Sequence, residues 1–228
     1  MGFIVDGAAI FLGGIIGGSF RKKINIKNLY ALSIGIMLIS LVGLLENILT
    51  VSGERLVGEH TVVVTIALVL GSVCGDLLRL EDRLHSLSNT QNAGMNGLID
   101  ATLFFGVGGL QISGPILFAL QGDSFQLILK GVIDLPFALM LGAAYGRRTA
   151  LSAFPVAAVQ LLLAALAFLL GDFMSQDLVC QLCSLGYLIL FFSGFNMLGT
   201  GGKRIKNINM LPGMLFIILY NFVKELFL

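Results

Sequence analysis

The sequence predicts an all-α, polytopic membrane helix bundle with about eight transmembrane helices, and three observations lead to this fold class. Hydrophobic residues make up 57% of the 228 residues and charged residues only 12%, whereas soluble domains carry roughly 25% charged residues. Apolar stretches of about 20 residues, the length that crosses a hydrocarbon core, recur along the chain. The basic residues cluster between these stretches, on alternate sides of them. A bilayer is therefore the solvent of this chain.

Short polar connections separate the eight expected spans. The spans are residues 3–20, 29–49, 61–78, 98–119, 125–146, 150–171, 178–198 and 209–227. Such spacing leaves almost no room for a separate soluble domain, so residues 1–228 are predicted to form a single transmembrane domain. The longest connection, residues 79–97, could lie on the membrane surface as a short amphipathic helix. The first span lacks a preceding basic segment and a small-residue cleavage site, and we expect it to be retained as a helix.

The distribution of lysine and arginine predicts that both termini face the outside of a bacterial cytoplasmic (inner) membrane. With the N-terminus outside, all but three of the 14 basic residues lie on the inner side, where short basic loops stay. The three outer residues are Arg55, Lys130 and Lys224. One helix more or fewer in the middle would scatter the basic clusters onto both faces, so the asymmetry also supports the span count.

The first and fifth spans share a pattern that suggests an internal repeat. Asp6 and Asp134 each follow two β-branched residues and each precede a glycine by eight residues. Both spans would run from outside to inside. One interpretation is a parallel repeat of two four-helix halves, residues 1–120 and 125–228, as some transporters have. The alternative is chance similarity between glycine-rich apolar helices.

The fourth span is predicted to be broken. Residues 106–115 combine four glycines with a glutamine, a serine and a proline in the middle of an apolar stretch. Glycine and proline favour a break, and freed backbone groups at membrane depth are tolerated only where protein or a water-filled cavity satisfies them. Discontinuous spans of this kind often mark transport sites.

Asp134 is the most unusual polar residue, because it lies about a third of the way into the fifth span. A charge at that depth is costly and is a candidate functional group by default. The alternative is a structural pair with Lys130, at the i, i+4 spacing of a helix. For Asp6, which lies near the outer end of the first span, solvation at the membrane interface is the competing interpretation.

These features together predict a ligand site near the bilayer midplane, built from the broken fourth span and the fifth span. Backbone groups near the glycines and uncharged polar side chains would contact the ligand, and Asp134 would bind a cation or carry a coupling proton. The predicted site residues are Gly108, Gly109, Gln111, Ser113, Gly114, Asp134, Gln160 and Asn209.

The sequence predicts neither a cofactor nor catalysis. Cys180 and Cys183 form a C-x-x-C, but a zinc site would need further ligands, and the only histidines are His60 and His85. Two small residues on a helix face explain the motif as well. The expected spans contain no histidine, and the chain has no H-E-x-x-H or G-x-S-x-G. An intramembrane enzyme is therefore the weakest of the functional alternatives.

Several segments together carry a resemblance to a known family. They are Gly114-Pro115-Ile116, residues 120–123, residues 130–134, Ser152 to Val156, and Ile205 to Pro212. As a set they resemble the bacterial domain-of-unknown-function 554 family of multi-pass inner-membrane proteins, and the likeness spans nearly the whole chain. The resemblance implies an inner-membrane protein with a transport-related role as one expectation.

The sequence thus predicts a membrane transporter or channel for a small solute or ion. The main alternative is a structural or regulatory membrane protein that transports nothing, which would also explain the small size and the many glycines. The expected partners are the lipid bilayer and the solute or ion, and the glycine faces would suit a homodimer. The 14 basic residues are dispersed and form no long stripe, so nucleic-acid binding is not expected.

Overall fold

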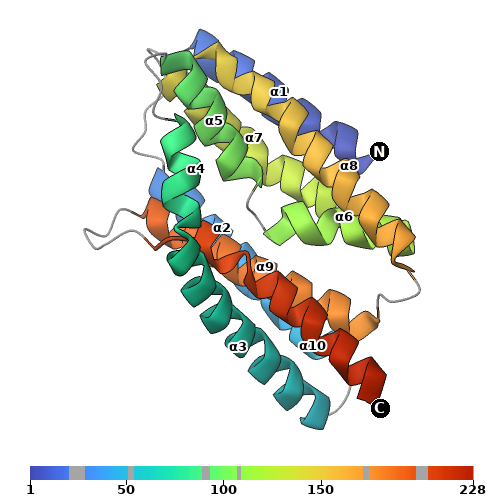
Figure 1. Cartoon of the computed structure of the whole chain (residues 1–228). Coiled ribbons are helices and arrows are strands. Elements are labelled where there is room, and N and C mark those ends of the chain that lie inside the picture. Colours follow the sequence, from blue (N-terminus) through green and yellow to red (C-terminus); the bar gives the residue numbers. More distant parts are fainter. Residues whose placement is uncertain are drawn as a thin grey trace. The chain divides into compact units, whose positions relative to one another are not determined.

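A computed structural model describes residues 1–20, 29–50, 54–88, 93–106, 109–171, 175–198 and 205–227. Within these ranges every regular element is a helix, and no strand is present (Figure 1). The predicted all-α class is confirmed.

Seven helices in the described ranges are long and apolar enough to cross a membrane, two of them together with the short helix before them. These are α1 (Gly2–Ser19), α2 (Leu29–Thr50), α3 (Glu54–Leu78), α7 (Phe125–Tyr145), α8 (Ala153–Leu169), α9 (Gln176–Met197) and α10 (Gly213–Phe227). The pair α5 (Ala93–Gly106) and α6 (Gly109–Gln121) passes the same test together and makes an eighth span. The chain is a polytopic membrane protein with the predicted number of spans.

The fourth span is broken, as the sequence predicts. Helices α5 and α6 are bent by 55° relative to each other. Helix α5 ends at Gly106 and α6 begins at Gly109, so both helices end or begin at a glycine of the predicted segment. Pro115 instead lies inside α6. Because proline has no N–H, the carbonyl of Gln111 lacks its i+4 helical donor.

The helices group into two compact units. Unit 1 consists of Met1–Asn28 and Asp82–Gly171, and unit 2 of Leu29–Glu81 and Asp172–Leu228. The boundary falls inside the short helix α4 (Leu80–Ser88), which lies in the connection where a surface helix was expected. Each unit takes helices from both sequence halves, and the repeat between these halves stays a prediction.

In unit 1, α1 and α7 pack along their whole length and run in the same direction (Figure 1). Gly2 meets Leu127 near the start of the two helices, and Gly17 meets Leu139 near their end. A Cβ atom at Gly17 would overlap the carbonyl group of Leu139. In lipid, small residues permit such close backbone approach, and the contact area replaces the hydrophobic effect as the source of association. The predicted common direction of these two spans is confirmed.

The two units repeat one local arrangement. In unit 1, α1 contacts the 3₁₀ helix η2 (Arg147–Ser152), which leads into α8. In unit 2, α3 contacts the 3₁₀ helix η4 (Ile208–Met210), which precedes α10. Glycines make both contacts close, since a Cβ at Gly14 would lie 2.7 Å from the Cα of Ala150, and one at Gly75 would overlap the backbone of Asn209. The glycines of α1 and α3 therefore serve equivalent packing roles.

Large apolar side chains cover the outside of the helices. Leu49 on α2 is 81% exposed and Phe168 on α8 is 75% exposed, and many leucines, valines and phenylalanines resemble them. Water-soluble monomers rarely expose apolar surface on this scale. A bilayer solvates these side chains, in agreement with the composition of the chain.

The contact of Gly17 with α7 makes a testable prediction. Gly17→Ala should lower the free energy of unfolding by about 1–3 kcal/mol, the usual cost of overpacking, because the added methyl group meets backbone atoms. Thermal unfolding of the purified protein in detergent measures the change. Gly7→Ala is the matched control on the same helix, since no atom lies within 4 Å of its added Cβ. Equal destabilisation by both substitutions would show that the α1–α7 contact is looser than described.

Candidate functional site

Unit 1 contains a cluster of buried polar and charged side chains, which we call the unit 1 cluster. Its members come from α1, α6, α7 and α8, and none is more than 7% exposed. They are Asp6, Gln111, Lys130, Asp134 and Gln160. Three of these residues were predicted to belong to the site, whereas Asp6 and Lys130 were not.

Lys130 lies at the centre of the cluster, between carboxylates from two helices. Its Nζ donates to Asp6 Oδ2 at 3.0 Å and also to Asp134 Oδ2. The ring centroid of Phe105 lies 5.9 Å from the same Nζ, within cation–π distance. The i, i+4 pair of Lys130 with Asp134, one of the two interpretations of the sequence, is confirmed.

One interpretation of this region is wrong. Asp6 is not solvated at the membrane interface, because its side chain is wholly buried against α7 and α8. Lys130, which was counted with the outer basic residues, lies inside α7 and is 3% exposed. Hydropathy places both residues near a span end, and the parallel contact of α1 with α7 buries them.

The amides of the cluster form a hydrogen-bonded chain. Gln160 Nε2 donates to Asp6 Oδ2 at 2.6 Å and to Gln111 Oε1 at 3.0 Å. Gln111 Nε2 in turn donates to the carbonyl of Val156 at 3.1 Å. Both partners of Gln160 Nε2 are acceptors, so the amide orientation follows from the network. These hydrogen bonds join the α8 backbone at Val156 to the carboxylate of Asp6.

Local sequence explains how these side chains meet. A Cβ at Gly131 would lie 3.1 Å from the Cα of Asp6, so glycine at this position brings the α1 backbone close to α7 beside Lys130. Gln111 lies in the first turn of α6, directly after the break in the fourth span. The helix that carries Gln111, an amide of the hydrogen-bonded network, therefore begins at the break in the fourth span.

The unit 1 cluster has too few hydrogen-bond donors for its acceptors and less positive than negative charge. Asp6 Oδ1 and Gln160 Oε1 are buried and have no hydrogen-bond partner among the described residues. With both carboxylates ionised, Lys130 neutralises only one of them, which leaves a net charge of −1. Buried unpaired acceptors and charges are costly in a medium of low dielectric constant. The arrangement suits a ligand that brings a positive charge, a hydrogen-bond donor, or both.

The remaining predicted site residues lie elsewhere or outside the described residues. Ser113 donates to Gln126 Oε1, and Gly114 packs against the side chain of Leu127, so both face the start of α7. Gly108 lies outside the described residues. Gly109 begins α6, but its surroundings also lie outside them.

Asn209 belongs to unit 2 and takes part in a different network. Its Nδ2 donates to Asp76 Oδ1 at 2.6 Å, and its Oδ1 accepts from the backbone N–H of Glu81 at 2.9 Å. These bonds tie η4 to the end of α3 and the start of α4. Asn209 therefore has a structural role within unit 2.

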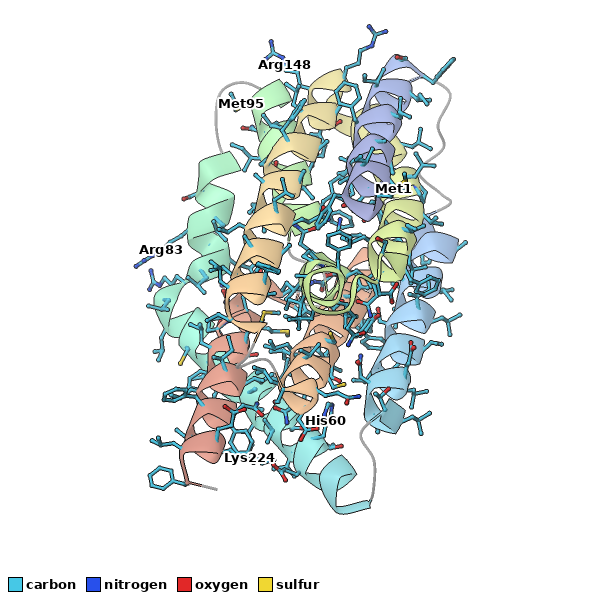
Figure 2. The ribbon with its side chains drawn as sticks, turned by 90° about the vertical axis from the view of Figure 1, so that its right-hand side faces the viewer. Met1, His60, Arg83, Met95, Arg148 and Lys224 are labelled. Atoms are coloured by element: carbon cyan, nitrogen blue, oxygen red, sulfur yellow. The ribbon has the colours of Figure 1, made fainter. Side chains whose placement is uncertain are left out.

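Unit 2 has a buried polar group of its own, which includes a histidine. His60 Nε2 lies 2.9 Å from Ser184 Oγ, and Asn221 donates to Gln181 Oε1 at 2.7 Å. In Figure 2, His60 and Lys224 lie toward the same end of this unit. The expectation that no span contains a histidine is wrong, because the third span begins at Gly58 and His60 is 2% exposed.

The cysteines and acidic residues do not assemble a metal centre in the parts of the chain that the structure describes. No group of three or more histidine, cysteine, aspartate or glutamate side chains there could hold a metal ion. Cys180 and Cys183 are buried on α9 and form no disulfide within the described residues.

Comparison with known proteins identifies the family of this chain. A family model described as "Protein of unknown function (DUF554)" matches residues 1–222. The chain belongs to the DUF554 family. The resemblance seen in the sequence is confirmed.

Two relatives of this DUF554 chain are similar over nearly their whole length. The uncharacterized membrane protein YdfK of Bacillus subtilis (strain 168) is 27% identical, over 94% of this chain and 92% of the relative. The uncharacterized protein YqgA of Escherichia coli (strain K12) is 22% identical, over 94% of this chain and 93% of the relative. No solved structure matches the DUF554 chain.

The charges of the unit 1 cluster predict an asymmetric response to substitution. Lys130→Met should lower the free energy of unfolding by about 3–5 kcal/mol, because it leaves two buried carboxylates without their cation. Asp134→Asn should cost little, since Lys130 then still pairs with Asp6 and the net charge falls to zero. Adding Asp134→Asn to Lys130→Met should restore part of the loss, in a double-mutant cycle followed by thermal unfolding in detergent.

Lys224→Met is the control for this cycle. Its ammonium pairs with Glu59 at 2.6 Å, but both side chains are more than a quarter exposed. A partly exposed pair contributes at most about 1 kcal/mol. If Lys130→Met were as mild as Lys224→Met, the two carboxylates of the cluster would not depend on Lys130.

Proposed function

We propose that this DUF554 protein is a membrane transporter or channel for a small solute or ion, and that its ligand binds at the unit 1 cluster. One observation carries the proposal: a buried carboxylate oxygen and a buried amide oxygen, which have no partner in the described part of the chain, lie in a cluster of net negative charge. The cluster begins one turn after the break in the fourth span.

The free-energy cost of burying the charged and polar groups of the unit 1 cluster supports a functional role. Apolar side chains of similar volume would stabilise a membrane bundle as well as a buried ion pair, and often better. Ionisable residues inside membrane spans typically mark ion pathways, proton relays or substrate sites. A polar cluster beside a discontinuous helix is a recurrent architecture of secondary transporters.

Each residue has a distinct role in the proposed site. Asp6 Oδ1 and Gln160 Oε1 offer acceptors to the ligand. Lys130 keeps the carboxylates of Asp6 and Asp134 close together, and Gln111 orients the amide of Gln160. Asp134, proposed from the sequence as the ligand-binding carboxylate, becomes the partner that holds Lys130 in place.

A structural or regulatory protein without transport is the second candidate, and the glycine contacts of α1 with α7 favour it. Under this alternative the cluster would only hold four helices together. Combined replacement of its charges by apolar residues would then leave the phenotype of the cell unchanged. A homodimer fits either function and stays a prediction.

We do not propose catalysis at His60 and Ser184, although their contact resembles a base beside a nucleophile. Both side chains are buried. His60 Nδ1 has no hydrogen-bond partner among the described residues, whereas a catalytic base needs a group there to orient it.

A ligand screen tests the proposed function. The purified protein is unfolded by heat in detergent with sodium, potassium, ammonium or magnesium chloride, or with single amino acids and organic acids, and choline chloride serves as the ionic-strength control. A bound ligand should raise the melting temperature, by an amount that reflects about 2.7 kcal/mol at 100 times its Kd. Asp6→Asn should weaken the effect. Uptake of the stabilising compound into proteoliposomes then measures transport, and stabilisation without uptake would favour the structural alternative.

Orientation is a second prediction of the proposed function. We propose that the protein lies in the bacterial cytoplasmic membrane with both termini outside and Arg147 and Arg148 inside. Figure 2 shows Arg148 and Met95 at the same end of unit 1. The basic residues 21–27 and 203–204 lie outside the described residues. Reporter fusions at the C-terminus and beside Arg147 should give opposite signals, and cytoplasmic signals from both would overturn this orientation.

A further inference from the structure

The two acceptors without partners among the described residues of the unit 1 cluster belong to two groups that are hydrogen-bonded to each other. Asp6 Oδ1 belongs to the same carboxylate as Oδ2, and Gln160 Oε1 belongs to the same amide as Nε2. Oδ2 and Nε2 are joined by a hydrogen bond of 2.6 Å. The unpaired oxygens therefore lie on two groups that already meet, and both groups are wholly buried.

A carboxylic acid and a primary amide can form a cyclic pair with two hydrogen bonds. The amide N–H donates to one carboxyl oxygen, and the acid O–H donates to the amide oxygen. The first bond of such a pair exists between Gln160 and Asp6. The second would need a proton on Asp6 Oδ1, because two acceptors alone cannot bond.

We propose that the unit 1 cluster binds a single proton on Asp6 Oδ1, which donates to Gln160 Oε1, and that this proton is the ion coupled to transport. The inference rests on the proposed function for its coupling role and on the geometry of Asp6 and Gln160 for the binding site. One proton completes the cyclic pair, supplies a partner for both acceptors and brings the charge of the cluster from −1 to zero.

The surroundings of Asp6 define the charge states. Lys130 and Asp134, both on α7, are the titratable groups that face Asp6 among the described contacts. Helices α6 and α8 present the amides of Gln111 and Gln160 instead. When Asp6 is protonated, Lys130 and Asp134 form a balanced pair. When Asp6 is ionised, Lys130 is shared between two carboxylates.

The number of available oxygens favours a proton over a divalent metal ion. Calcium takes six to eight oxygen ligands and magnesium an octahedral set. The unit 1 cluster offers two spare oxygens within the described part of the chain. A proton needs one oxygen to bind and one to accept its hydrogen bond.

The proposed cycle balances without a further reactant. Water on one side of the membrane gives a proton to Asp6 Oδ1, and an O–H bond forms. On release this bond breaks, the electron pair stays on the carboxylate, and the proton passes to water on the other side. Release also frees Gln160 Oε1 and restores the charge of −1, so the protonated and ionised states differ in what they can bind.

Infrared spectroscopy of the purified full-length protein tests the site. In choline chloride at neutral pH, the wild type should show the carbonyl stretch of one buried carboxylic acid, and the band should disappear as the pH rises. Asp6→Asn should abolish it, whereas a band from Asp134 would survive this substitution. Gln160→Leu removes the amide that would form both hydrogen bonds of the cyclic pair, so the band should shift in frequency.

Three results would overturn the inference. The band could survive in Asp6→Asn, which would place the proton on Asp134. It could be absent at every pH at which the protein is folded. It could also vanish when sodium chloride replaces choline chloride at constant pH, which would identify a metal cation as the ligand.

Asp6→Asn is expected to fold, because its amide can donate to Gln160 Oε1 and so imitates the protonated acid. Its melting temperature should be less dependent on pH than that of the wild type, which should gain stability toward acid pH as the proton binds. If Asp6→Asn does not fold, Gln160→Leu carries the test through the shifted frequency of the band, and an unshifted frequency would refute the acid–amide pair.

Proteoliposomes separate this inference from the proposed function. A pH-sensitive dye inside the vesicles reports proton movement, and the compound found in the ligand screen reports uptake. The expected band without proton movement or uptake would support the proton site and contradict transport. If the rate of uptake changes neither with an imposed pH gradient nor in Asp6→Asn, the result would support transport and contradict the coupled proton.

Discussion

The sharing of one ammonium between two carboxylates is the interaction on which the polar interior of unit 1 depends. Lys130 reaches Asp134 along its own helix and Asp6 across to α1. A single buried charge would be expelled or neutralised in a medium of low dielectric constant. Because Lys130 pairs with both carboxylates, α1 and α7 can bring three ionisable groups together at membrane depth. The amide of Gln160 on α8 then donates to Asp6, and the amide of Gln111 on α6 bonds to Gln160.

Glycine makes that sharing geometrically possible. Association of helices in lipid relies on close packing, since lipid tails are as apolar as leucine side chains. Gly131 lets the α1 backbone approach α7 at the level of Asp6, and Gly17 lets the same helices touch again near their other end. The polar cluster and the glycine contacts are therefore two aspects of one parallel helix pair, and a change in either would alter the other.

The cluster is incomplete as a purely structural device. A stabilising network would leave no buried acceptor unpaired, yet Asp6 and Gln160 each retain one within the described residues. Gln111, in the first turn of α6, lies beside these groups and accepts from Gln160. These features together favour a site that gains and loses a ligand over a core that only holds helices together.

The sequence alone determined the all-α class, about eight apolar spans and the bend in the fourth, and it singled out Gln111, Asp134 and Gln160, which the structure brings together in the unit 1 cluster. These features follow from local properties: apolar length, glycine and proline content, and the cost of a polar group inside a span. Only the tertiary structure decided that Asp6 and Lys130 are central and that Asn209 belongs to another network. Hydropathy shows how far a residue lies from the end of its own span. Whether a residue near that end is buried depends on which other helix packs beside it. The same limit applies to His60, whose burial depends on where α3 begins and on its contact with α9.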